Sequence, residues 1–209
     1  FYNAHKPSDL LADHSVIEQD NSHKDDGNPE HQGIPATTSS DKSEEHTTNN
    51  SAIASQTDKL TKLLNKDATQ NFCRTALQNM LPDKFSALYI IDLDHFKDAN
   101  DRYGHQYGDR VLIEFSRQLR KKFRPNDCIG RFGGDEFVVI VDSLPNMEVV
   151  IRKAEQIKQI AFNLTVEGKD KFVTASIGIA IAPQNGRDYD SLFAAADKAV
   201  YHVKNSGKN

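Results

Sequence analysis

The sequence has only two cysteines, Cys73 and Cys128, which lie far apart and match no metal-binding spacing. So few cysteines provide no disulfide framework, and we interpret both as reduced thiols of a cytosolic domain. Long apolar runs are also missing, as is a signal peptide, so the sequence predicts no membrane span. Because the chain begins with Phe1 rather than Met, it is compatible with an upstream sensor domain or membrane segment.

The chain also lacks a strong excess of basic residues. Up to residue 57, 3 basic residues face 10 acidic ones, and polar residues dominate without a period that would build an apolar face. We predict a disordered polar arm or linker over residues 1–57. From residue 58 on, 23 basic residues face 20 acidic ones, an excess too small to indicate nucleic-acid binding but compatible with a phosphate ligand.

Residues 58–209 show the periodicities of a folded domain. Apolar residues at helical spacing predict helices over residues 58–81, 110–123, 147–162 and 189–205. Apolar runs predict one strand that ends at Asp92, two that flank the turn Gly133–Glu136, and one over residues 171–182. This order is that of a βαββαβ core with added helices. We therefore predict an α+β, ferredoxin-like domain, whose antiparallel sheet is backed by helices on one face.

Acidic residues occupy two places that this topology brings together. Asp92 ends the first strand, and Asp135 and Glu136 follow Gly133 and Gly134 in the hairpin turn. Converging carboxylates repel one another, and Mg²⁺ relieves that repulsion while it also binds phosphate oxygens. The glycines would let a triphosphate approach the backbone amides of the turn. An ordinary glycine hairpin with solvated acids explains the turn alone equally well.

Several ordered motifs decide between these interpretations. The segment "DKLTKLLNK" (58–66) resembles the opening DxLTGLxNR of GGDEF-domain diguanylate cyclases, and "DLDHFKDANDRYGHQYGD" (92–109) resembles their DxDxFKxxNDxxGHxxGD. "GGDEF" (133–137) resembles the family signature, and "SIGIA" (176–180) and "ADKAVYHVKNSGKN" (196–209) are similar to its later strand and closing motif. The resemblance extends over residues 58–209. It implies a nucleotidyl-cyclase-like fold and the formation of cyclic di-GMP from two GTP.

The resemblance implies a metal site at the acidic strand ends. Asp92, the carbonyl of Leu93 and Glu136 would hold Mg²⁺, with Mn²⁺ as an alternative. Asp135 would either help to deprotonate the attacking 3′-hydroxyl or complete the metal shell, so the base is left open between Asp135 and Glu136.

The resemblance also implies how the domain would bind GTP. The triphosphate would meet the cations Lys97, Lys204 and Lys208 beside the turn glycines Gly133 and Gly134. Asn100 and Asp109 resemble the family's guanine-reading pair. A carboxylate can accept hydrogen bonds from N1–H and the exocyclic amine of guanine together, which adenine does not offer, so this pair would select GTP over ATP. Each residue alone is equally typical of a helix cap or turn.

The segment "RPND" stands where many family members have an RxxD site that binds their own product. Arg124 and Asp127 would then hold cyclic di-GMP away from the active site and inhibit the enzyme. An ordinary surface turn would be the better explanation of these four residues taken alone.

The resemblance further implies a head-to-tail homodimer, because each domain holds one GTP and the two nucleotides must attack each other. The first alternative is a catalytically silent domain that binds GTP or cyclic di-GMP for regulation. The second is a cyclase that closes a mononucleotide ring on a related core.

Three residues depart from the family motifs. Lys62 and Lys66 stand where the family has glycine and arginine, in a motif near the join with upstream modules. We therefore expect them to affect coupling to a sensor rather than chemistry. Lys208 stands where arginine is usual, so it keeps the charge but loses the bidentate fork.

Overall fold

The structure of the chain is a computed structural model that describes residues 56–170 and 173–206. The predicted arm up to residue 55 and Lys208 therefore lie outside the described residues. The helices are α2 (Lys66–Gln78), α3 (Phe96–Tyr103), α4 (His105–Lys122), α5 (Met147–Phe162) and α6 (Tyr189–Asn205). The strands are β1 (Phe85–Asp94), β2 (Cys128–Gly133), β3 (Glu136–Leu144), β4 (Thr165–Val166), β5 (Lys169–Asp170) and β6 (Thr174–Ala182).

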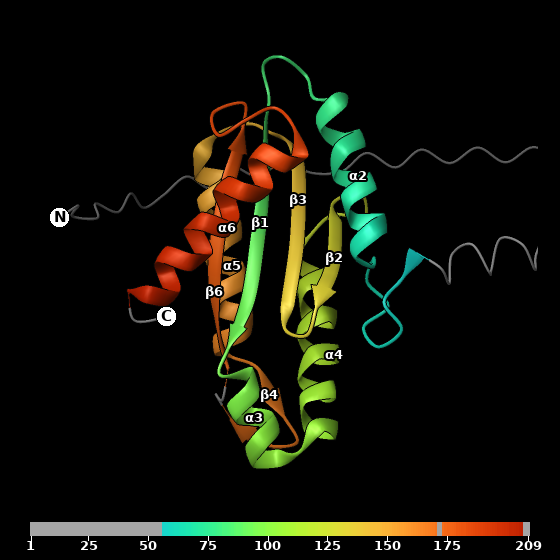
Figure 1. The fold of residues 1–209 in the computed structure, drawn as a ribbon, viewed down its shortest axis with the longest axis vertical. Coiled ribbons are helices and arrows are strands. Elements are labelled where there is room, and N and C mark those ends of the chain that lie inside the picture. The colour runs from blue at the N-terminus through green and yellow to red at the C-terminus, as the bar shows by residue number, and fades with distance from the viewer. Residues whose placement is uncertain (1–55, 171–172, 207–209) are drawn as a thin grey trace, which may run out of the picture. The chain divides into compact units, whose positions relative to one another are not determined.

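The main sheet has four strands in the order β2-β3-β1-β6, and every neighbouring pair is antiparallel. This is the strand order of a βαββαβ core, so the predicted fold class is confirmed. Because β1 and β2 both end where β3 begins, the end of β1 and the β2–β3 turn lie at the same end of the sheet (Figure 1). The sheet therefore brings two acidic segments together that are about forty residues apart in the sequence.

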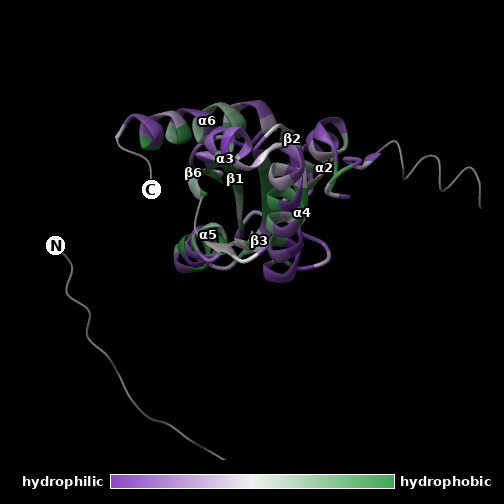
Figure 2. Ribbon diagram, turned by 90° about the horizontal axis from the view of Figure 1, so that it is seen from below, coloured by the Kyte–Doolittle hydropathy of each residue, from purple (hydrophilic) through white to green (hydrophobic). Residues whose placement is uncertain are grey.

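Helices cover both faces of the sheet, whereas the sequence predicted helices on one face. Leu88, Ile90 and Val138 belong to a core shared with α2 and α6. Tyr89 and Phe137 belong to a second core, which is shared with α4 and α5. Figure 2 shows α2 and α6 on one side of the sheet and α4 and α5 on the other, with apolar residues toward the sheet. Continuous apolar runs such as that of β1 are typical of strands buried on both faces.

The first helix begins later than the sequence predicted, at Lys66 rather than at residue 58. Asn65 caps it, because the Asn65 side chain accepts a hydrogen bond from the backbone N–H of Ala68. The preceding residues bind the edge of β2 instead. The N–H of Leu64 donates to the carbonyl of Ile129 (3.2 Å), and the N–H of Arg131 donates to the carbonyl of Leu64 (2.9 Å). The opening motif is therefore fixed to the strand that leads into the hairpin turn.

Two elements were not predicted from the sequence. The helix α3 precedes α4, and Gly104 separates the two with a φ of +85°, a conformation that glycine adopts without strain. The short β4–β5 hairpin precedes β6. None of the described helices is long and apolar enough to cross a membrane.

Candidate active site

Three carboxylates meet at one end of the sheet. Asp92 on β1 and Glu136 on β3 are direct partners in the antiparallel register. The backbone N–H of Leu93 donates a hydrogen bond to the carbonyl of Asp135 (3.2 Å), which ties the end of β1 to the turn. All three acidic side chains are half-buried. The structure therefore brings together the acidic residues that the sequence assigned to the metal site and to the base.

Burial and the charge of Asp92 raise the pKa of the two carboxylates at the turn. Burial raises the pKa of Asp135, and the neighbouring charge of Asp92 raises it further. Burial and Asp92 likewise raise the pKa of Glu136, to which Asp197 on α6 also contributes. Lys204 opposes both shifts, and its Nζ lies 2.7 Å from Oδ2 of Asp92. Such a cluster of acids stabilises a cation placed between them.

The donor chemistry of this cluster fits Mg²⁺. Within residues 56–170 and 173–206, no group of three or more His, Cys, Asp or Glu side chains is arranged to hold a metal ion. The expected ligand set, however, contains only two side chains, Asp92 and Glu136, with the carbonyl of Leu93 as the third donor. Mg²⁺ is commonly held by one or two carboxylates, and water and substrate phosphates complete its shell. The Lys204 ammonium on Asp92 shows that a positive charge is accommodated at this position.

Arg131 of β2 holds the hairpin turn and links it to the opening motif. Arg131 donates two hydrogen bonds to the carbonyl of Gly134, at 3.1 and 2.8 Å. The same guanidinium lies 3.1 Å from Oδ1 of Asp58, which also accepts hydrogen bonds from the backbone N–H and hydroxyl of Thr61. The opening motif thus supports the turn through a charge-assisted link.

The fold itself does not require the two glycines of the turn. Gly133 and Gly134 are not among the glycines with positive φ. A Cβ built at either position would meet no atom within 4 Å, so both face open space. Their lack of side chains therefore leaves room for a molecule outside the domain.

Of the two predicted phosphate-binding cations among the described residues, Lys204 lies directly at the carboxylates. Lys97 is exposed in the first turn of α3, which follows the end of β1. Lys208 lies outside the described residues. The phosphate-binding role of Lys97 and Lys208 therefore stays a prediction.

The predicted guanine-reading pair, Asn100 and Asp109, lies on the α3–α4 helical hairpin. Asn100 lies on α3, and its amide packs so closely on α4 that a Cβ at Gly108 would come within 1.9 Å of its Oδ1. Asp109, the residue after Gly108, is exposed. The hairpin follows directly after the end of β1 (Figure 1). Because residue 108 is a glycine, the Asn100 side chain can pack against α4 next to Asp109.

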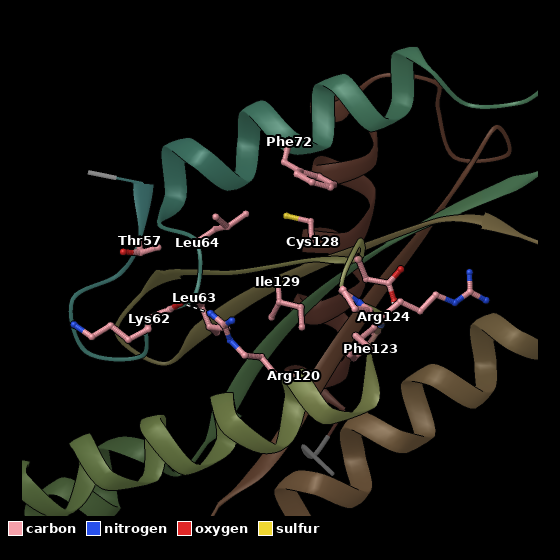
Figure 3. A pocket seen from close by; sticks show the side chains of 12 residues that line it. Thr57, Lys62, Leu63, Leu64, Phe72, Arg120, Phe123, Arg124, Cys128 and Ile129 are labelled. Carbon is pink, nitrogen blue, oxygen red and sulfur yellow. Dashed lines mark hydrogen bonds between the residues drawn. The ribbon is translucent and has the colours of Figure 1, made fainter. Parts of the chain in front are cut away.

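The RxxD segment lies at the far end of β2 from the GGDEF turn. Asp127 accepts a hydrogen bond from the backbone N–H of Arg124 (2.8 Å), and its own N–H donates to the carbonyl of Arg124 (3.0 Å). Both residues line a pocket of about 520 Å³ with apolar walls that include Phe72 and Ile129. Figure 3 shows the Lys62 and Arg124 side chains extending from opposite ends of this pocket. The segment is therefore a surface turn beside a pocket.

Sequence reasoning missed several residues at the site. Asp94 is buried, and its carboxylate accepts hydrogen bonds from the hydroxyls of Thr174 (2.9 Å) and Ser176 (2.8 Å), which fixes the end of β1 to β6. Lys66, expected to matter for coupling to a sensor, is close enough to lower the pKa of Glu136. These residues stand inside the recognised motifs, but the motifs do not reveal which of their side chains touch.

The domain combines an α+β fold with an acidic hairpin turn at one end of its sheet, and comparisons with known proteins identify the family. The family model of the diguanylate cyclase, GGDEF domain, matches residues 55–209. The chain is 36% identical over 154 residues to the bifunctional diguanylate cyclase/cyclic di-GMP phosphodiesterase MucR of Pseudomonas aeruginosa PAO1, a match that covers 73% of the chain and 22% of MucR. It is 34% identical over 157 residues to the diguanylate cyclase DgcM of Escherichia coli K12, which covers 75% of the chain and 38% of DgcM.

A solved structure is similar over the same region. The crystal structure of a sensory box/GGDEF family protein from Caulobacter crescentus CB15 is 33% identical in sequence and superposes with a TM-score of 0.67. That match covers 73% of this chain and 99% of the other. The chain therefore belongs to the GGDEF-domain diguanylate cyclase family. The match spans only 22% of MucR and 38% of DgcM, so most of each of those longer proteins has no counterpart in the matched region.

Proposed function

We propose that this chain is a diguanylate cyclase, which converts two GTP into cyclic di-GMP and two pyrophosphates. The observation that carries the proposal is the convergence of Asp92, Asp135 and Glu136 at the end of β1 and the adjoining turn. An ordinary solvated hairpin does not need half-buried acids close together, because burial and neighbouring negative charge raise the free energy of an ionised carboxylate. The cluster instead suits a reaction that brings positive charge and phosphates to this place.

In this reaction the 3′-oxygen of each GTP forms a bond to the α-phosphorus of the other. The bond between that phosphorus and the β-phosphate's bridging oxygen breaks, and pyrophosphate leaves with the electron pair. The proton of the 3′-hydroxyl goes to Asp135 or Glu136, whose raised pKa improves either one as a proton acceptor. Mg²⁺, when bound by Asp92, Glu136 and the carbonyl of Leu93, supplies charge neutralisation and orients the triphosphate.

The remaining residues bind and orient the nucleotide. Lys97, Lys204 and Lys208 offset charge on the phosphates, while Asp109 and Asn100 read the guanine edge. Gly133 and Gly134 leave the space in which the triphosphate lies against the turn. One domain holds one GTP in this scheme, so two copies of the chain meet head to tail around a two-fold axis.

Arg124 and Asp127 form the site for product inhibition. The exposed guanidinium of Arg124 suits a phosphate and the guanine edge, and the adjoining pocket offers apolar walls for a base. Because this turn lies at the opposite end of β2 from the catalytic turn, bound product would hinder the approach of two domains without touching GTP.

Incubation of the purified chain with GTP and Mg²⁺, followed by identification of the products by mass, tests the proposal. We expect cyclic di-GMP and pyrophosphate in a ratio of one to two. Tight nucleotide binding without any product would instead identify a silent regulatory domain. A cyclic mononucleotide as the product would favour the related cyclase chemistry.

A further inference from the structure

Lys66 lies beside the GGDEF turn, where its ammonium contacts the Phe132 ring. It is the first residue of α2, two positions after Leu64, which shares backbone hydrogen bonds with β2. Its Nζ lies 5.8 Å from the centroid of the Phe132 ring, near the end of β2. Phe132 in turn stacks on Phe193 of α6, with centroids 5.6 Å apart and rings inclined by 17°. The Lys66 side chain is exposed, so its charge is available to a ligand.

The charged groups at this end of the sheet follow the order of the strands. Lys66 lies over the edge strand β2, Glu136 on β3, Asp92 on β1, and Lys204 reaches Asp92 from α6, which packs on β1 and β6. Two cations therefore flank two carboxylates. Phe132, which Lys66 contacts, directly precedes Gly133, and Gly133 pairs with Glu136 in the antiparallel register, so Lys66 lies on the β2 side of Glu136.

We propose that Lys66 is a further catalytic cation, which contacts the α-phosphate of the GTP bound by the second copy of the chain. This inference rests on the proposed cyclase activity. Lys204 binds Asp92 on β1, and Lys97 lies in the first turn of α3, which follows β1, so both lie on the β1 side of the acidic cluster and serve the nucleotide bound in the same domain. Lys66 lies on the β2 side, beside the Gly133–Gly134 turn, whose two glycines face open space.

The chemistry of the reaction gives this cation a task. The α-phosphate gains negative charge as the 3′-oxygen attacks it and the bond to pyrophosphate breaks. The nucleotide's own domain supplies lysines and Mg²⁺ to the triphosphate, and a cation from the facing domain would add positive charge at the α-phosphate while it is attacked. An ammonium held by Phe132 beside Glu136 would reach that phosphate only when two domains are joined.

The test compares Lys66→Met with Lys66→Arg, and with Lys59→Met, which removes an exposed lysine from the same opening motif. Turnover is measured at saturating GTP and Mg²⁺ over a range of chain concentrations. Binding of 3′-deoxy-GTP, which cannot attack, is measured by calorimetry at chain concentrations too low for dimers. We expect Lys66→Met to lower kcat by at least about tenfold, while Lys66→Arg and Lys59→Met stay within about threefold of the wild type.

The affinity for 3′-deoxy-GTP should not change in Lys66→Met, whereas Lys204→Met should weaken it. Equal losses of this affinity in the two variants would assign Lys66 to the nucleotide of its own domain and overturn the proposal. A turnover that recovers at high chain concentration would overturn it too, because Lys66 would then serve only dimerisation. If the wild type makes no cyclic di-GMP, the proposed function itself fails. If the wild type is active and Lys66→Met retains its full kcat, the inference about Lys66 alone fails.

Discussion

The ammonium of Lys204 lies 2.7 Å from Oδ2 of Asp92 and so joins the last helix to the end of the first strand. The pair is partly exposed, with 37% and 20% of the two side chains accessible, so screening by water weakens it. A divalent cation would compete with Lys204 for this carboxylate. If a cation bound Asp92, Lys204 would become available to the phosphates, and these two residues would couple the proposed metal site to the proposed triphosphate site.

The first prediction concerns the metal ligand Glu136. Glu136→Gln should reduce cyclic di-GMP formation by orders of magnitude while the fold is retained, because an amide preserves the shape but binds Mg²⁺ poorly. Product formation at saturating Mg²⁺ and circular dichroism are the measurements. Glu148→Gln, an exposed change in the first turn of α5, is the matched control. Activity above about a tenth of the wild type, a loss of only about 1.4 kcal/mol, would remove Glu136 from the metal site.

The second prediction concerns the preference for guanine over adenine nucleotides. Asp109→Ala should weaken GTP binding and narrow the preference for GTP over ATP, because the guanine donors lose their acceptor. Competition between the two nucleotides measures this directly. Asp83→Ala changes an exposed aspartate in the connection from α2 to β1 and should leave the preference intact. Unchanged discrimination in Asp109→Ala would leave Asp109 as a turn residue.

The meeting of Asp92 with the hairpin turn could be predicted from the sequence, because the apolar runs set the strand order. The start of the first helix could not. Leu60, Leu63 and Leu64 have helical spacing, yet Leu64 pairs with β2 and Leu63 is buried in the core. Backbone pairing with a strand more than sixty residues later overrides the local periodicity.

Contacts between distant motifs were also beyond the sequence. Asp58 and Arg131 are 73 positions apart, and neither the motif around Asp58 nor the GGDEF turn indicates that they touch. The same holds for Lys66, whose motif suggested a role in coupling until the structure brought it to Phe132. Motifs identify which residues the family retains, whereas side-chain pairing depends on how the layers pack.

The third prediction concerns acid stability. Burial raises the pKa of Asp58, but hydrogen bonds from Thr61 and Arg131 outweigh it, so the pKa lies below 3.8. A lowered pKa stabilises the fold above the unfolded value and loses that effect as the pH falls through the folded value. Asp58→Asn should therefore lower the free energy of unfolding by about 1–2 kcal/mol at pH 7. In urea titrations the deficit should shrink as the pH falls below about 4; a deficit that stays constant with pH would contradict the assignment.

The fourth prediction concerns feedback. Arg124→Ala should keep turnover but lose inhibition by cyclic di-GMP, since the exposed guanidinium contributes to binding and the backbone of the turn is held by Asp127. Initial rates are compared with and without added micromolar product. Arg187→Ala changes an exposed arginine before α6 and should remain inhibited. If cyclic di-GMP inhibited Arg124→Ala as strongly as the wild type, or did not inhibit the wild type at all, the assignment of this inhibitory site would be wrong.

The fifth prediction concerns Lys62, which has a φ of +59° at the position where the family motif has glycine. A residue with a Cβ loses roughly 1–2 kcal/mol in this left-handed conformation, and glycine avoids that strain. Glycine also gains entropy in the unfolded chain, which offsets about 0.4–1 kcal/mol of the benefit. Lys62→Gly should therefore raise the free energy of unfolding by about 0.5–1 kcal/mol in urea titrations. Lys59 is not among the residues with positive φ, so Lys59→Gly should only lose stability, and equal losses in both variants would show that Lys62 stores no strain.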